Sequence, residues 1–280
     1  MSEMHPEIQP EMQTKILIDK NLCVGDELCL KVCPTMCFRM KEGKAATVPM
    51  AGAVCIGCGH CVAVCPKAAI SLNGVDPRSL PKAGAQKDSK GAMANVDDLE
   101  GLIKSRRSIR QYKAQDINRE DLLRALEISR YAPTGKNSQD IEWIIISGRA
   151  KVMNLAEKII EVMRSLPDCK RLTQAHDQGL DPIFRHAPCV IFAHCEKDNY
   201  ALRLVDAGIA CGYLDLTLNS LGLGACWAGY AISIARMNPQ LLEDCGLPPH
   251  REITGGLMVG YPSLRYQRIP SRKPLRLTWA

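Results

Sequence analysis

The sequence has few aromatic residues and no long apolar run. Phe, Trp and Tyr make up 5% of the 280 residues, too few for the stacking surface that binds single-stranded nucleic acid. No run approaches the roughly 18 apolar residues of a membrane-spanning helix. The N-terminal stretch MSEMHPEIQPEMQTK is polar and acidic and lacks the apolar core of a secretory signal. We therefore expect a cytoplasmic protein with neither a nucleic-acid nor a membrane partner.

Length and composition indicate a globular protein with two domains. Hydrophobic residues are 46% and charged residues 24% of the chain, which is ordinary for folded proteins. The net charge is +6, from 36 basic and 30 acidic residues. Residues 1–80 hold 8 of each sign, so the excess lies in 81–280. This excess is typical of a solvated face, or of a site for an anionic cofactor where arginines cluster.

Cysteine is abundant, with 14 residues, and eight of them fall between positions 23 and 65. Dense and regularly spaced cysteines in a cytosolic chain indicate metal binding rather than disulfides. Residues 15–72 contain two similar halves, each a cysteine run followed by proline and an apolar exit. This is an internal repeat.

The second half of the repeat reads Cys55-x2-Cys58-x2-Cys61-x3-Cys65-Pro66, the iron–sulfur run of bacterial ferredoxins, in which the fourth cysteine binds the other cluster. A structural zinc knuckle is the alternative, but zinc sites rarely show this duplicated run with proline after the last cysteine.

The first half departs from this pattern, because it reads Cys23-x5-Cys29-x3-Cys33-Pro34 and places Asp26 where the second cysteine is expected. Crossing the fourth ligands gives one [4Fe–4S] cluster with four thiolates: Cys55, Cys58, Cys61 and Cys33. The other cluster takes Cys23, Cys29 and Cys65, with Asp26 at the fourth corner.

Two interpretations of the Asp26 corner stay open. Either Asp26 ligates the fourth iron through oxygen, which would hold that iron less tightly than sulfur, or the corner is empty and the cluster is [3Fe–4S]. Cys37 is a third candidate, but it aligns with Ala69 in the repeat and is by default a core residue. Residues 15–75 thus resemble the two-cluster ferredoxin domain, and the resemblance implies electron transfer.

From position 95 the pattern changes to alternating helices and strands. Asn118 is expected to cap a helix, and Asn238-Pro239 to begin another. The apolar stretch 202–222 predicts a central buried helix. We expect further helices over 96–107 and 151–166, and strands over 141–147, 188–194 and 253–261. The predicted organisation is a leader (1–14), a ferredoxin domain (15–75), a linker (76–94) and an α+β domain (95–280).

Four segments of the second domain carry candidate binding groups. KSRRSIRQYK (104–113) offers arginines and a hydroxyl suited to a phosphate. APTGKNSQ (132–139) offers amides and hydroxyls, including Gln139, for a heterocycle edge or sugar. LGLGACWAGY (221–230) has glycines that let backbone approach a flat ligand, and VGYPSLRYQRIPSRKP (259–274) adds further cations.

Taken in order, these segments resemble the nitroreductase-like flavoproteins. The resemblance implies an α+β fold and a homodimer with FMN at its interface. It assigns the FMN phosphate and ribityl chain to Arg106, Arg107, Ser108, Arg110 and Arg272. It assigns contacts from the other protomer to Pro133, Thr134, Gly135 and Asn137, and places Ala228 and Gly229 along the isoalloxazine. A further tail cation common in the family is replaced by Pro270, so Arg268 is only a candidate substitute.

The expected function is an FMN and iron–sulfur oxidoreductase. A low-potential donor such as reduced ferredoxin would load the clusters, and FMN would pass hydride to a small nitro, quinone or enone acceptor. The alternatives are an electron-transfer module or redox sensor acting on a protein partner, and a dehydrogenase running in reverse.

The sequence assigns no catalytic residue. We expect Cys226 to be a buried core residue rather than a reactive thiol. Segment 165–186 is the candidate substrate-selecting region, with Lys170, Arg171 and Asp177 as its candidate residues.

Overall fold

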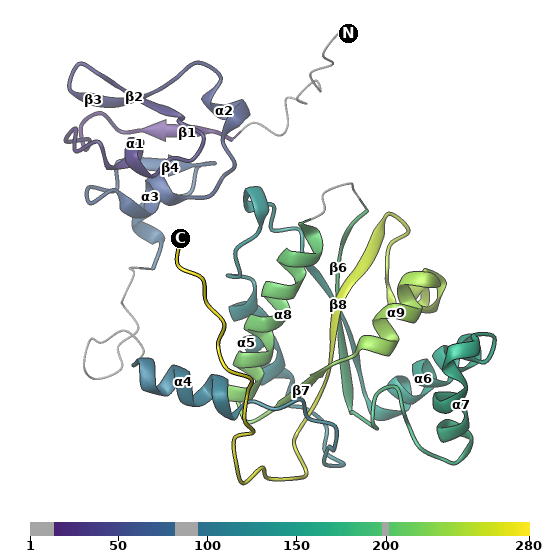
Figure 1. Ribbon diagram of the computed structural model, residues 1–280. Coiled ribbons are helices and arrows are strands. Elements are labelled where there is room, and N and C mark those ends of the chain that lie inside the picture. The colour runs from purple at the N-terminus through teal and green to yellow at the C-terminus, as the bar shows by residue number, and fades with distance from the viewer. Residues whose placement is uncertain (1–13, 82–94, 198–201) are drawn as a thin grey trace. The chain divides into compact units, whose positions relative to one another are not determined.

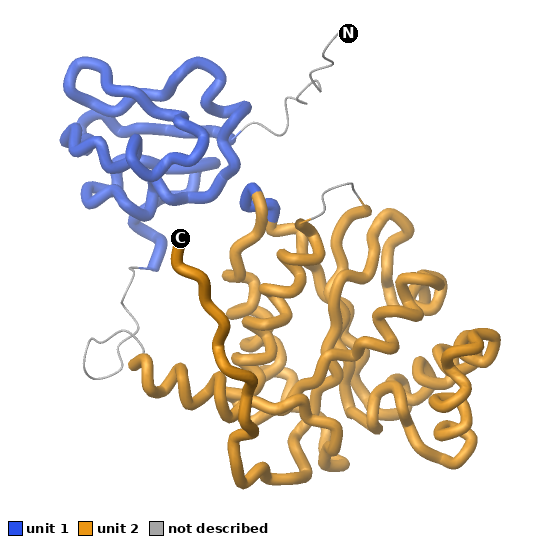
Figure 2. The backbone as a smooth tube through the Cα atoms, viewed as in Figure 1, with its two compact units in different colours: residues 1–93, 136–138 blue, residues 94–135, 139–280 orange. Residues whose placement is uncertain are grey.

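The computed structural model describes residues 14–81, 95–197 and 202–280. The chain forms two compact units, residues 1–93 with 136–138 and residues 94–135 with 139–280 (Figure 2). The predicted leader lies almost wholly outside the described residues, as does most of the predicted linker. In the described part, no helix is long and apolar enough to span a membrane.

The first unit is built from two short antiparallel sheets and small helices (Figure 1). Strand β1 (Ile16–Ile18) pairs with β4 (Ile70–Leu72), so the two ends of the repeat meet. Strands β2 (Phe38–Lys41) and β3 (Lys44–Thr47) form a hairpin between the halves. The helical pieces are α1 (Leu28–Val32), α2 (Ala51–Val54), α3 (His60–Val64) and the 3-10 turn η2 (Pro77–Ser79).

The internal repeat is visible in the helices of this unit. Helix α1 carries Cys29 at its second position and α3 carries Cys61 at the same place. Both helices follow a residue in the left-handed region, Glu27 at φ 62° and Gly59 at φ 73°. The two cysteine runs therefore adopt the same local backbone despite the Asp26 substitution.

The β2–β3 hairpin folds over the first cysteine run. Gly25 has φ 76°, and a Cβ atom there would lie 2.3 Å from the Gly43 carbonyl oxygen. Only glycine accommodates both the torsion and this approach. The Ala45 N–H and the Lys44 ammonium also reach Cys23 from the hairpin, which fixes the start of the run.

The second unit contains an antiparallel sheet of order β5-β6-β8-β7. Its strands are β5 (Glu142–Ser147), β6 (Cys189–Glu196), β7 (Gly224–Trp227) and β8 (Arg251–Gly260). Strands β6 and β8 are central and almost entirely buried. Together with its helices this sheet gives the expected α+β fold.

Helices cover both faces of the sheet (Figure 1). On one face α5 (Arg119–Ser129) and α8 (Arg203–Ser220) pack through Leu122, Leu214 and Leu218. On the other face α6 (Arg149–Arg164) and α9 (Gly229–Met237) pack through Ile159, Ile160 and Ile234. The remaining elements are α4 (Val96–Ser105), α7 (Lys170–Asp177), η3 (Gly135–Asn137), η4 (Pro167–Cys169) and η5 (Pro239–Cys245).

Several predicted elements are confirmed and three are corrected. Asn118 caps α5 by accepting the Glu120 N–H at 2.8 Å. Asn238 makes no such side-chain cap, and the segment that follows is the 3-10 helix η5. Strand β5 is an edge strand with alternating burial rather than a buried strand. Helix α8 is not buried all round, because Val205 and Tyr213 are exposed.

Candidate cofactor site

The predicted phosphate segment begins where α4 ends. The Arg107 guanidinium donates to the carbonyl oxygens of Lys104 (2.6 Å) and Arg106, and so holds the last turn of α4. Its Nε is buried and has no hydrogen-bond partner among the described residues. Buried donors are normally paired, so this orphaned N–H fits an absent acceptor such as a phosphate oxygen.

Arg106 already has a partner within the chain. Its guanidinium lies 3.1 Å from the carboxylate of Asp215 on α8. Burial raises the pKa of Asp215, and the Arg106 charge opposes this shift. The other Asp215 oxygen is buried and has no hydrogen-bond partner in the part of the chain that the structure describes. Arg106 would therefore bring a partly neutralised guanidinium to a phosphate.

Ile109 fixes the middle of the segment against the sheet. Its N–H donates to the Ala225 carbonyl of β7 at 2.9 Å. A Cβ atom at Gly224 would lie 2.4 Å from the Ile109 side chain, so the glycine permits this contact. The neighbouring Ser108 and Arg110 are thereby placed at β7.

Cys226 on β7 lies close enough to this segment for its thiol to be affected by it. Burial raises the pKa of its thiol, while the Arg110 charge, a hydrogen bond with Ser108 and the Arg106 charge lower it. In this structure the charges of Arg110 and Arg106 and the Ser108 side chain therefore all act on the Cys226 thiol, which is buried. The thiol itself is packed, as expected.

A cavity of about 340 Å³ opens beside this cluster. It joins two predicted cofactor residues, Arg110 and Gly229, with Trp227 and Tyr230. Gly229 begins α9, and Ala228 before it provides no side-chain cap for the helix N–H groups. Uncapped N–H groups at a helix start attract anionic or electron-rich ligand atoms. The cavity therefore fits a flat ring with acceptor atoms.

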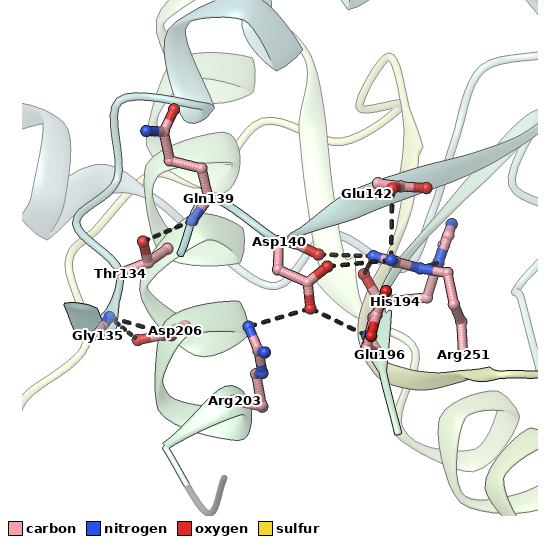
Figure 3. Close-up of polar contacts among 10 residues, drawn as sticks. All are labelled: Thr134, Gly135, Gln139, Asp140, Glu142, His194, Glu196, Arg203, Asp206 and Arg251. Atoms are coloured by element: carbon pink, nitrogen blue, oxygen red, sulfur yellow. Dashed lines mark hydrogen bonds and ion pairs between the residues drawn. The ribbon is translucent and has the colours of Figure 1, made fainter. Parts of the chain in front are cut away.

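The predicted loop 133–139 is anchored to α8 by a buried carboxylate. Asp206 on α8 accepts the Gly135 N–H with both oxygens, at 3.0 and 3.2 Å (Figure 3). The Thr134 hydroxyl accepts the Gln139 N–H at 3.0 Å. Asn137 and Gln139 both have positive φ, 54° and 50°. Non-glycine residues in this region store strain that often marks a functional loop.

An ionic network fixes the far end of this loop. Asp140 binds the guanidinium of Arg251 at 3.0 Å and that of Arg203 at 3.0 Å (Figure 3). Arg251 Nε also donates to His194 Nδ1 at 2.8 Å. Burial and the Arg251 charge lower the pKa of His194, so it is a neutral, satisfied core histidine. Sequence patterns do not identify Asp206 or Asp140 as the residues that fix this loop, because their partners are distant along the chain.

Within one chain the predicted FMN residues fall into separate places. Thr134 and Gln139 line a second cavity of about 210 Å³, distinct from the cavity at Arg110 and Gly229. Arg272, like Arg268, is exposed in the C-terminal tail, which contains no helix or strand. The structure thus brings the 106–110 and 228–229 segments together at one cavity and leaves the 133–139 loop apart from them. The tail segment begins beside the first one, because the Lys113 N–H donates to the Tyr261 carbonyl at 2.9 Å and the Ser263 N–H to the Gln111 carbonyl at 3.1 Å.

The cysteine runs of the first unit direct backbone donors at their sulfurs. The N–H of Cys37 donates to Cys33 Sγ (3.2 Å), and that of Ala69 to Cys65 Sγ (3.4 Å). These two contacts are equivalent in the repeat. Cys23 and Cys55 accept N–H groups from Ala45 and Gly57. Hydrogen bonds to ligand sulfurs stabilise thiolates and tune cluster potentials, so this donor set fits iron–sulfur clusters.

The surroundings of Cys33 fit a cluster ligand, whereas those of Cys37 fit a core residue. Burial would raise the pKa of Cys33, but hydrogen bonds from Cys37 and Thr35 outweigh it and lower that pKa. Burial raises the pKa of Cys37, which is completely buried. Its thiol has its own partners, Thr35 and the Ala51 carbonyl. These contacts favour packing for Cys37.

Asp26 is exposed, and one of its carboxylate oxygens accepts the Leu28 N–H at 3.2 Å at the start of α1. No three His, Cys, Asp or Glu side chains within the described ranges are arranged to share a single metal ion. A cluster requires a different spacing, since each of its thiolates binds a separate iron.

The substrate-selecting candidates in segment 165–186 lie mostly on a surface helix. Asp177 at the end of α7 pairs with Arg164 at 2.7 Å, and Lys170 and Arg171 are exposed at its start. The part of this segment that reaches the larger cavity is its end, where Arg185 lines the wall. Sequence reasoning does not single out Arg185.

Comparison with known proteins covers both units. Residues 103–261 match the model of the Nitroreductase family, and residues 15–66 match the 4Fe-4S dicluster domain. A 4-nitrobenzoate reductase of Nocardioides sp. is 23% identical over 212 residues, 62% of this chain and 85% of that protein.

Solved structures share the fold. A nitroreductase of Bacteroides fragilis with bound FMN has a TM-score of 0.57 at 23% identity, covering 65% of this chain and 98% of its own. One of Desulfitobacterium hafniense, also with bound FMN, has a TM-score of 0.57 at 22% identity, covering 67% and 100%. The chain belongs to the nitroreductase family of oxidoreductases and carries a 4Fe-4S dicluster domain ahead of the family's own domain.

Proposed function

We propose that this protein takes electrons from a low-potential donor such as reduced ferredoxin and delivers them to a small organic acceptor of the nitro, quinone or enone type. Its cofactors would be FMN and two iron–sulfur clusters. When bound, the clusters supply single-electron transfer and FMN supplies two-electron transfer to the acceptor. The observation that carries the proposal is the presence, in one chain, of both an amide-wrapped set of cysteine sulfurs and a cavity at the Arg106–Arg110 segment.

The residues proposed for FMN divide into three roles. Arg107, Ser108 and Arg110 would bind the phosphate and ribityl chain, with Arg106 and Arg272 as further cations. The backbone of Ala228 and Gly229 would lie along the ring at the start of α9. The loop at 133–139 would contribute from a second chain, which is supported by its separation from the Arg110 cavity.

A homodimer would complete such a site, and α8 offers a surface for it. Leu204, Val205 and Tyr213 are exposed on this helix. Cβ atoms added at Gly208 and Gly212 would meet nothing within 4 Å. One side of α8 is therefore apolar and uncovered within a single chain, which is typical of a helix at a protein–protein interface.

Turnover with a small acceptor tests the proposed function. Anaerobic holoprotein supplied with reduced ferredoxin should reduce a nitroarene, a quinone or an enone continuously. If both cofactors are reduced but no such acceptor is turned over, the protein is an electron-transfer module or a sensor. If an organic substrate reduces the clusters without any donor, it is a dehydrogenase.

For the Asp26-side cluster we propose a fourth iron bound weakly by carboxylate oxygen. Air-free wild-type protein treated with a chelator should then fall from about eight to about seven irons per chain, whereas Asp26→Cys should keep about eight because thiolate binds iron more tightly than carboxylate. Asp26→Asn is the matched control and should hold about seven throughout. Wild-type protein that keeps eight irons after chelation would contradict weak ligation.

A further inference from the structure

The loop at residues 181–187 is fixed from inside the protein. Asp181 is buried, and its Oδ1 accepts the N–H groups of Ile183 and Phe184, both at 2.9 Å. Its Oδ2 accepts the His186 N–H at 2.8 Å. Three charge-assisted hydrogen bonds to one carboxylate and the fully buried Phe184 side chain make this loop a rigid support.

Arg185 stands on this support in a costly conformation. Arg185 and His186 are consecutive non-glycine residues with φ 57° and 56°. Residues with a side chain adopt this left-handed region rarely, because it is sterically strained. Phe184 before them and Ala187 after them are buried, whereas Arg185 is exposed. The loop therefore holds the Arg185 side chain outward on a strained backbone, and such strain often marks a functional position.

Arg185 lines the cavity of about 340 Å³ that also contains Arg110, Trp227 and Tyr230. None of the described residues that line this cavity carries a carboxylate. Through the described part of the chain, the Arg185 side chain forms no salt bridge. Trp227 and Tyr230 are each 45% exposed and offer flat apolar walls. The lining suits a flat aromatic molecule that carries an anionic group.

We propose that Arg185 selects acceptors by binding their carboxylate, so that the protein prefers aromatic acids over neutral aromatic molecules. The inference rests on the proposed function, in which the Arg106–Arg110 segment serves the FMN phosphate. Arg185 comes from a different loop and is an additional cation at the same cavity. Arginine binds a carboxylate through two parallel hydrogen bonds, and Trp227 or Tyr230 would stack on the ring.

Binding of benzoate against benzamide tests this proposal in the full-length holoprotein. Calorimetric titration should show benzoate binding to the wild type more tightly than benzamide. Arg185→Gln should weaken benzoate by about 10- to 100-fold, the effect of losing one charged hydrogen-bonding partner, and leave benzamide unchanged. Arg185→Lys should restore part of the loss. Arg124→Gln on α5 removes the same charge from an exposed arginine elsewhere and should change neither ligand.

Equal weakening of benzoate and benzamide, or no preference for benzoate in the wild type, would overturn the proposal. Loss of bound FMN in Arg185→Gln with benzoate affinity kept would assign Arg185 to the cofactor instead. Calorimetry does not need the flavin chromophore, and FMN content is measured separately by absorbance. A chain that binds no FMN would therefore defeat the proposed function while the benzoate comparison still decides the role of Arg185.

Discussion

Replacing Arg107 and Arg110 together with alanine should release FMN and leave the iron–sulfur clusters in place. Arg107 has a buried N–H without an acceptor, and Arg110 lines the larger cavity. Each charged hydrogen bond to a phosphate is worth about 1.5–3 kcal/mol. The pair should therefore weaken FMN binding by about 10² to 10⁴-fold, measured as FMN per chain after gel filtration and as Kd by fluorescence.

The matched control is Arg124→Ala with Arg171→Ala, which removes two exposed arginines from α5 and α7. It should keep stoichiometric FMN. Because Arg107 also holds the end of α4, circular dichroism and cluster absorbance must show that the double variant remains folded. A folded Arg107→Ala, Arg110→Ala protein with its full complement of FMN would refute the phosphate assignment.

Arg251→Ala should destabilise the second unit by about 3–5 kcal/mol, the usual cost of removing one partner from a buried ion pair. The Arg251 side chain is only 5% exposed and serves Asp140 and His194 together. For a unit of this size the loss lowers Tm by roughly 6–20 °C. Scanning calorimetry of the variant should show this shift in the transition of the second unit.

Arg236→Ala provides the comparison. Arg236 lies 3.9 Å from Glu252, and the two side chains are 43% and 34% exposed. Such a surface pair contributes about 0–1 kcal/mol. If Arg251→Ala is no more destabilising than Arg236→Ala, the ionic network in Figure 3 does not stabilise the second unit or the end of the 133–139 loop.

Local patterns predict the elements whose signals are local. Asn118 caps α5 as predicted, and Asn95 caps α4 by the same contact, because in both the capping oxygen and its N–H target are two residues apart. The cysteine runs give the same helix twice because each run carries its own turn residues. These features need no knowledge of the rest of the chain.

Elements that depend on distant neighbours are the ones that sequence reasoning misses. Strand β7 is four residues long and contains Gly224, whose lack of a side chain makes room for Ile109. The apolar run of β5 predicts burial on both faces, but an edge position leaves Ile145 exposed. Asn238 has the extended φ of −135° that is ordinary before proline, and its side chain caps no N–H group among the described residues.

The candidate site likewise has parts with local sequence signals and parts that depend on distant residues. The arginine segment and the Ala228–Gly229 pair can be found from sequence because they belong to compact motifs. The groups that position the 133–139 loop cannot, because Asp206 lies 71 residues from Gly135 and Asp140 lies 111 residues from Arg251. Arg185 becomes a candidate only when the fold brings it to the cavity of Arg110.

The most direct test of the account is anaerobic reduction of the purified protein, followed optically, with NADH, NADPH and reduced ferredoxin offered separately. In the proposed function, electrons enter at the clusters of the first unit. We therefore predict that only reduced ferredoxin will reduce both the clusters and FMN rapidly. Rapid reduction of FMN by NADH or NADPH, with the clusters following, would contradict this direction and make the flavin the point of entry.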